Sequence, residues 1–188
     1  MPVGLLGAIA RFACTDPMRP LLHGVLIGEL EVVACDGQRI VRVDINTKPF
    51  EGSSWLSDDK RSAYLIPLNV ARAVVSAAKD LCVKRARLSC TGQDLRIELR
   101  RDDGVLVLAV ETRTQASEYP PIDQVMISTQ SGSPPSIMFD PRLLEDMAPV
   151  MDACDARGLK IVGWGDELSP MQFGAKGIRF VVMPMRAP

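Results

Sequence analysis

Aromatic residues, histidine and long hydrophobic runs are scarce in this sequence of 188 residues. Phenylalanine, tryptophan and tyrosine make up 5% of the chain, so a hydrophobic core must come mainly from aliphatic side chains and methionine. No apolar run approaches the roughly 20 residues that span a bilayer, and the apolar N-terminal stretch lacks the basic start of a signal peptide. We therefore expect a globular, cytoplasmic protein.

The sequence offers little material for catalysis. His23 is the single histidine, and a lone histidine in an expected strand is more often structural than catalytic. No G-x-S-x-G, P-loop or G-x-G-x-x-G motif occurs. The five cysteines form no C-x-x-C pair, which disfavours zinc and favours small buried thiols. We expect no enzyme activity, no catalytic residue, no metal and no cofactor.

A weak threefold repeat organises the chain, and each unit is expected to hold a helix followed by three short strands. The expected helices cover 4–14 and begin at Pro67 and at Asp140-Pro141. The expected strands lie at 21–27, 30–35, 38–45, 84–90, 94–101, 104–111, 159–164, 168–173 and 177–183, with further strands before the second and third helices at 63–67 and 136–139. Asp36-Gly37 predicts a tight hairpin, and Pro149 predicts a kink or early end of the third helix.

This pattern predicts an α+β protein with antiparallel sheets that carry helices on one face. Each unit buries one face against a neighbour. A polar loop at 47–62 separates the first unit from the second, and the segment 113–134 before the third unit has the composition of a linker. The third unit thus lacks a partner in the sequence, and we expect it to find one in another chain.

Three separated segments carry a family resemblance: VVACDGQRIV at 32–41, SEYPPIDQVM at 117–126 and FVVMPMRAP at 180–188. They are similar to ATDGHRLA, RFPDYRRVLP and YVVMPMRL of the bacterial DNA polymerase III beta sliding clamp, in the same order. The helix segment YLIPLNVARAVVSAAK also resembles the family's VIVPRKGVIEL stretch. The resemblance covers nearly the whole chain but only part of a family member.

The resemblance implies a DNA-clamp fold made of one full clamp domain plus a half domain. Residues 1–125 resemble the family's middle domain, and residues 126–188 resemble the end of its last domain. Family rings hold twelve units, so chains of three units would need four copies for the same number. The resemblance therefore implies a homotetramer, with a dimer as the simpler alternative.

In the family the three signatures converge on a pocket for short linear peptides of polymerases, clamp loaders and repair proteins. Its counterparts here are Cys35, Gly37, Gln38, Arg39, Ile40, Pro120, Gln124, Val125, Val181, Val182, Met183, Pro184, Met185 and Arg186. Apolar and methionine side chains suit a groove that accepts several partners. The alternative is that VVMPM is merely a last core strand. Gln38 and Cys35 depart from the family's His and Thr, which bears on partner preference.

Duplex DNA is the second partner that the resemblance implies, because clamp helices line the hole of the ring. The expected contacts are Arg11, Arg72, Lys79, Lys84 and Arg85. The net charge is −1, so any basic surface must be local, and acidic positions on the third helix oppose phosphate. An ordinary solvated helix face is the alternative interpretation.

The resemblance thus predicts a DNA sliding clamp, a processivity factor that encircles duplex DNA and tethers polymerase or repair proteins. A second hypothesis is a clamp-like decoy or regulator of replication proteins that keeps the pocket without encircling DNA. A third, an unrelated hydrolase, would have to depend on His23.

Overall fold

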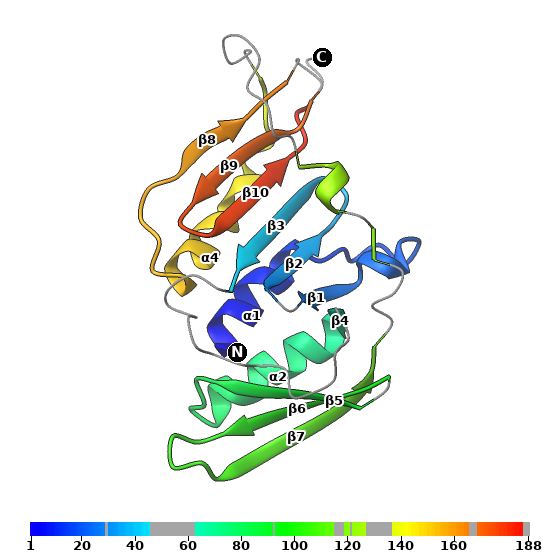
Figure 1. The fold of residues 1–188 in the computed structure, drawn as a ribbon, viewed down its shortest axis with the longest axis vertical. Coiled ribbons are helices and arrows are strands. Elements are labelled where there is room, and N and C mark those ends of the chain that lie inside the picture. Colours follow the sequence, from blue (N-terminus) through cyan, green and yellow to red (C-terminus); the bar gives the residue numbers. More distant parts are fainter. Residues whose placement is uncertain are drawn as a thin grey trace.

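A computed structural model describes residues 1–28, 30–45, 63–91, 93–114, 119–120, 122–126, 137–165 and 169–185. Two antiparallel sheets and a set of short helices make up the molecule (Figure 1). The helices are α1 (Val3–Ile9), η1 (Ala10–Phe12), η2 (Pro20–Leu22), α2 (Leu68–Asp80), η4 (Ile122–Gln124), α3 (Arg142–Glu145) and α4 (Met147–Ala153). This α+β architecture confirms the fold class expected from the sequence.

Seven strands form the larger sheet in the order β4-β1-β2-β3-β10-β9-β8. Their bounds are β1 Gly24–Gly28, β2 Glu31–Cys35, β3 Arg39–Asp44, β4 Ala63–Pro67, β8 Lys160–Gly163, β9 Met171–Ala175 and β10 Ile178–Val182. The smaller sheet has the order β5-β6-β7, with bounds Ala86–Thr91, Asp94–Arg100 and Leu106–Arg113. The repeat of helix plus three strands is therefore present in all three units.

The third unit pairs within its own chain. Strand β10 runs antiparallel to β3, with Val181 opposite Ile40 and Phe180 opposite Val41. Helix α4 packs against α1 behind the same sheet (Figure 1). The expectation that another chain supplies this partner is therefore wrong for the β10 side of the unit.

The main core lies between the sheets and the helices. Alternate strand residues such as Val41, Phe180 and Ile97 point inward and are fully buried, because side chains on a strand alternate between its two faces. On α1, Leu5, Leu6 and Ile9 are fully buried, as the helical spacing predicted. Helix α2 carries the equivalent stripe for the second unit.

Pro149 lies in the first turn of α4, where a missing N–H leaves no helical hydrogen bond unmade. The third helix is divided at Asp146 into α3 and α4, which places the break three residues before the proline. The Arg142 N–H at the start of α3 donates a hydrogen bond to Asp140 Oδ1 at 3.0 Å, although the residue at the N-cap position is Pro141. The expected disruption is confirmed, and it falls on the N-terminal side of Pro149.

The Phe180→Ala substitution should destabilise the protein by about 3–5 kcal/mol, because it removes a fully buried ring. Phe180 stacks on Phe12 with ring centroids 5.8 Å apart and joins the third unit to the first. Urea unfolding followed by circular dichroism measures the effect. Met18→Ala is the control, because Met18 is 85% exposed, and its unfolding free energy should change by less than about 0.5 kcal/mol.

Candidate functional site

A second apolar cluster, called here the outer cluster, covers the face of the seven-stranded sheet that points away from the helices. Its buried members are Val33, Cys35, Ile40 and Val181. Leu22, Leu26, Tyr119, Ile122, Val125 and Met126 pack against them and are partly buried. The strands β2, β3 and β10 place the four buried side chains together, because Ile40 lies opposite both Cys35 and Val181.

The segment 122–126 covers the side of this cluster that faces away from the sheet. Asp123 in η4 receives a hydrogen bond from Arg42 Nη1 at 2.7 Å, and the Val125 N–H donates to the Ile122 carbonyl at 3.0 Å. Ile122 and Val125 thereby rest on the sheet. Asp123 is itself exposed, so this attachment depends on a surface ion pair that is worth about 1 kcal/mol or less.

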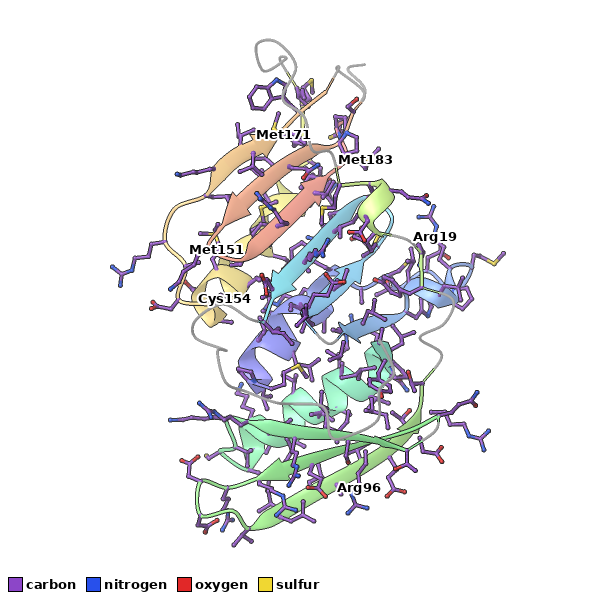
Figure 2. The ribbon with its side chains drawn as sticks, viewed as in Figure 1. Arg19, Arg96, Met151, Cys154, Met171 and Met183 are labelled. Atoms are coloured by element: carbon purple, nitrogen blue, oxygen red, sulfur yellow. The ribbon has the colours of Figure 1, made fainter. Side chains whose placement is uncertain are left out.

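The C-terminal tail lies directly on the Asp36-Gly37 hairpin. The Met183 N–H donates to the Gln38 carbonyl at 2.8 Å, and the Met185 N–H donates to the Met138 carbonyl at 2.8 Å. Both methionine side chains stay in solvent, at 39% and 48% exposed. Figure 2 shows Met183 at the end of β10, beside the hairpin and η4. The tail thus presents flexible apolar side chains next to the outer cluster.

The hairpin has the geometry that its sequence predicts. Asp36 Oδ1 accepts hydrogen bonds from the N–H groups of Gln38 and Arg39, both at 2.9 Å. Gly37 has φ +92°, a backbone conformation that L residues with a side chain rarely adopt. The exposed Gln38 side chain therefore stands at the tip, where the family has a histidine.

Most of the predicted peptide-binding residues meet in one region of the molecule. Cys35, Ile40, Val125 and Val181 belong to the outer cluster. Around it, partly or fully exposed, lie Gly37, Gln38, Pro120, Gln124, Met183, Pro184 and Met185. Arg186 lies outside the described residues.

Arg39 and Val182 point to the other side of the sheet, so they do not join the outer cluster. Val182 is fully buried in the main core. Arg39 is drawn inward by two carboxylates, Asp36 and Asp146, whose oxygens lie 2.9 Å from its guanidinium nitrogens. Its guanidinium also donates to the Leu143 carbonyl at 3.3 Å and lies 4.7 Å from the Phe12 ring centroid. We therefore exclude both residues from the candidate site.

The lining of the outer cluster is electrically neutral near pH 7. Burial raises the pKa of the Cys35 thiol and of the Tyr119 hydroxyl, so both groups keep their protons. A neutral, apolar surface binds hydrophobic side chains and offers no activated nucleophile.

The cysteines do not all have the buried environment expected from the sequence. Cys14, Cys35 and Cys154 are buried, and burial raises the pKa of Cys154 to about 12. Cys82 is exposed, with φ 55°, because it ends the turn after α2. The expectation of buried thiols is therefore wrong for Cys82.

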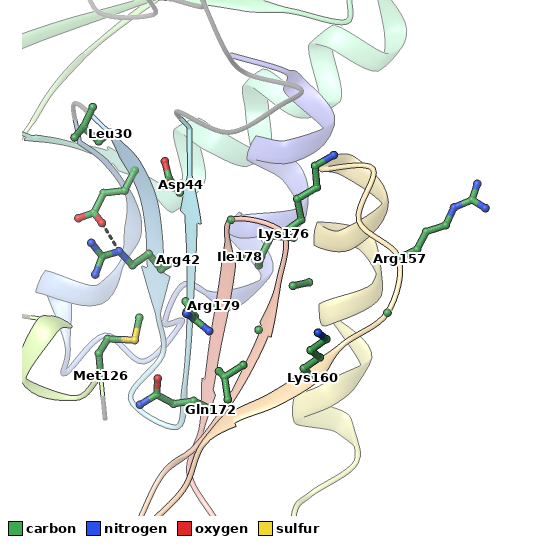
Figure 3. A pocket seen from close by; sticks show the side chains of 16 residues that line it. Leu30, Arg42, Asp44, Met126, Arg157, Lys160, Gln172, Lys176, Ile178 and Arg179 are labelled. Carbon is green, nitrogen blue, oxygen red and sulfur yellow. Dashed lines mark ion pairs between the residues drawn. The ribbon is translucent and has the colours of Figure 1, made fainter. Parts of the chain in front are cut away.

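A cavity of about 930 Å³ continues from the outer cluster along the same sheet face (Figure 3). Arg42, Arg179 and Lys160 line it together with the buried Gln172, and Arg42 forms an ion pair with Glu31. Sequence reasoning missed these residues. The alternation in β3 could have found Arg42, which lies two residues after Ile40 and so shares its face.

The residues predicted to contact DNA are all exposed, and they divide between two places. Arg11, Lys79 and Lys84 line one shallow depression of about 480 Å³ between α1 and α2, with Pro149 of α4 at its side. Arg85 follows Lys84 directly. Arg72 lines a separate depression beside His23. Arg11 also forms an ion pair with Asp146 at 3.2 Å, so part of its charge is already balanced.

Within the described ranges, no group of three or more His, Cys, Asp and Glu side chains is arranged to hold a metal ion. The helices in the same part of the chain are also too short or too polar to cross a membrane.

Solved structures of bacterial sliding clamps share this fold. The beta sliding clamp of C. crescentus matches 98% of the chain with a TM-score of 0.70 and 13% identity. The DNA polymerase III beta subunit of Thermotoga maritima matches 99% with a TM-score of 0.70 and 15% identity. The beta chain from Streptococcus pneumoniae TIGR4 matches 100% with a TM-score of 0.67 and 15% identity.

These matches show that the chain has the sliding-clamp fold, as its three sequence segments predicted. The chain spans about 63% of the length of the first two clamps, so it has the fold of a shortened clamp. No family model matches the sequence, and no curated protein matches it.

The Arg39→Ala substitution should destabilise the protein by about 3 kcal/mol, because it leaves two partly buried carboxylates without their shared cation. Chemical unfolding measures this loss. Arg142→Ala is the matched control, since Arg142 pairs with Asp140 on the surface and is 81% exposed. Equal stability of the two variants would contradict the structural role of Arg39.

Proposed function

We propose that the protein is a DNA sliding clamp that forms a homo-oligomeric ring around duplex DNA in the cytoplasm. It tethers polymerase, clamp-loader or repair proteins through a peptide-binding slot formed by the outer cluster and the C-terminal tail. The observation that carries the slot is the seating of Met183 on the Asp36-Gly37 hairpin, beside the apolar side chains of Ile40 and Val181.

The slot suits a short peptide with bulky apolar anchors. Met183 and Met185 have flexible, polarisable side chains that adapt to different partners. Each Leu or Phe anchor that is buried against them gains on the order of 1.5–3 kcal/mol. A few such anchors supply the roughly 8 kcal/mol of micromolar binding. Chemistry at the slot is not needed for this function, which agrees with its neutral lining.

The arrangement of helices supports a DNA-facing side. Helices α1, α2 and α4 lie on one side of the seven-stranded sheet, and Lys79, Lys84 and Arg11 gather in one depression there. Exposed Glu145, Asp152 and Asp155 of the third unit weaken the attraction to phosphate. A closed ring keeps DNA by topology, so loose and salt-sensitive contacts are enough.

The count of units supports a ring of four chains. Three units per chain and twelve units per ring, the number implied by the sliding-clamp resemblance, require four copies, whose mass is about 82 kDa against 20.5 kDa for one chain.

A clamp-like decoy or regulator that keeps the slot without encircling DNA is the second candidate. The observation that favours it is the short chain, which spans about 63% of the clamps it matches.

The double substitution Met183→Ala with Met185→Ala should reduce the affinity for a fluorescent peptide carrying Leu and Phe anchors by at least about tenfold, because both apolar contacts are lost. Fluorescence anisotropy titration measures the change. Met18→Ala serves as the control, since it removes an exposed methionine outside the slot. Unchanged binding in the double variant would refute the slot.

Charge reversal by Lys79→Glu with Lys84→Glu should weaken binding to open duplex DNA and make it less dependent on salt. Each lost phosphate contact lowers the slope of log affinity against log salt by about 0.9. Lys160→Glu with Lys176→Glu makes the same change in charge beside the outer cavity. If both double variants lowered the salt dependence of DNA binding by a similar amount, the helix side would not be the specific DNA-binding face.

A further inference from the structure

The edge strand β7 is an exposed template for pairing. It forms the outer rim of the three-stranded sheet (Figure 1), with β6 on one side and no other strand beside it in the described part of the chain. The strand runs over eight residues, Leu106–Arg113, and starts with the apolar run Leu-Val-Leu-Ala-Val. A long apolar edge without proline or lysine lacks the usual protection against pairing with another chain.

We propose that β7 pairs antiparallel with β7 of a second copy of this chain about a twofold axis, so that neighbouring chains in the ring face each other head to head. The inference rests on the proposed ring and names the contact that builds it. It differs from a head-to-tail ring, in which β7 would meet a different strand of the next copy.

A pairing of the same kind as the proposed β7 contact already exists within the chain. Strands β3, β7 and β10 are the last strands of the three units. Two of them, β3 and β10, pair antiparallel over five residues, and the third residue of each, Val41 and Phe180, lie opposite each other. The pairing of last strand with last strand is thus the way in which these units join side by side.

The odd number of units leaves one last strand over. Because β3 and β10 pair within the chain, β7 finds an equivalent strand only in another copy. The other edges of the described sheets are β4, β5 and β8, and none of them is a last strand of a unit. The N-terminus lies beside β5 through the Pro2–Arg85 bridge, and β4 precedes a helix. The edge strand β8 is also of a different kind from β7. It follows its helix directly, as β1 does, and β1 pairs with β4, the strand that precedes a helix. A contact between two copies of β7 is self-complementary and closes about a twofold axis.

The side chains of β7 favour the antiparallel direction. The charged residues Glu111 and Arg113 lie near its C-terminal end, and the exposed apolar residues Val105 and Leu106 lie at its start. An antiparallel copy brings the charged end of one strand beside the apolar start of the other. A parallel copy in register would bring Glu111 against Glu111, which is destabilising.

Burial at the edge is incomplete in a single chain. Leu108 and Val110 face inward, opposite the buried Leu99 and Ile97 of β6, but they are only partly buried. A neighbouring strand would cover the side of these residues that β6 leaves open. The contact therefore adds apolar burial to the backbone hydrogen bonds of the new ladder.

Single-cysteine crosslinking tests the twofold axis. In a background with Cys82→Ser and Cys90→Ser, each of the seven positions from Val107 to Arg113 is changed to cysteine one at a time, because the axis can pass beside an inward or an outward residue. A residue near a twofold axis meets its own copy within disulfide distance, about 4.4–6.8 Å between Cα atoms. At least one of the seven variants should form a covalent dimer on mild oxidation. Arg87→Cys, on the far strand β5, is the control and should stay monomeric under denaturing conditions.

Native mass spectrometry of an edge variant supplies the second measurement. The unmodified protein should show about 82 kDa, four chains of 20.5 kDa. Ala109→Lys places a positive charge near the same charge on the neighbouring copy and should break the β7 contact. In a head-to-head ring of four chains, the β7 contact alternates with a second kind of contact. Loss of the β7 contact should therefore leave dimers of half the mass. Met18→Lys adds the same charge at an exposed position elsewhere and should leave the mass unchanged.

The outcomes separate this contact from the proposed ring. A full-mass oligomer with no disulfide at any of the seven positions would overturn the β7 contact and leave the ring in place. A disulfide that forms only in a mixture of Ala109→Cys with Lys160→Cys would show head-to-tail pairing with β8 and would also overturn it. A monomer at micromolar concentration would refute both, whereas peptide anisotropy would still report on the slot.

Discussion

The backbone pairing of β3 with β10 is the constraint on which the rest of this structure depends. Five residue pairs join the third unit to the first, although more than 130 positions separate the two strands in the chain. On the inner face the pairing brings Phe180 against Phe12 and lets α4 pack on α1. On the outer face it brings Val181 beside Ile40 and carries the C-terminal tail to the Asp36-Gly37 hairpin. Without this contact there would be neither a continuous sheet nor a slot.

The two faces of that sheet serve different purposes because side chains alternate along a strand. Neighbouring residues in one segment therefore have separate roles. Ile40 faces outward into the candidate slot, whereas Arg39 faces inward and holds Asp36 and Asp146 together. Val181 and Val182 divide in the same way. A motif that is continuous in the sequence thus supplies both the scaffold and the binding surface. The effect of a substitution on stability can be told from its effect on binding only when the face of that residue is known.

The fold also determines where the charged side chains gather and which strand edges remain unpaired. The chain as a whole is nearly neutral, yet the basic side chains of Arg11, Lys79 and Lys84 gather on the helix side and others gather at the outer cavity. An odd number of units leaves one equivalent strand edge unpaired, since two last strands satisfy each other inside the chain. This asymmetry is what makes a second copy of the same chain the natural partner for β7.

The sequence by itself determined the local structure. Apolar spacing predicted the helices and their buried faces, Asp36-Gly37 predicted the hairpin, and the three separated segments predicted the clamp fold. It also named Ile40, Val125 and Val181, which the fold brings together. Only the tertiary structure decided that the third unit pairs within the chain, that Arg39 turns inward, and that Tyr119 and Gln172 join the outer face. The physical reason is that periodicity acts over a few residues, whereas the register between distant strands, and with it the surroundings of each side chain, depends on the packing of the whole molecule.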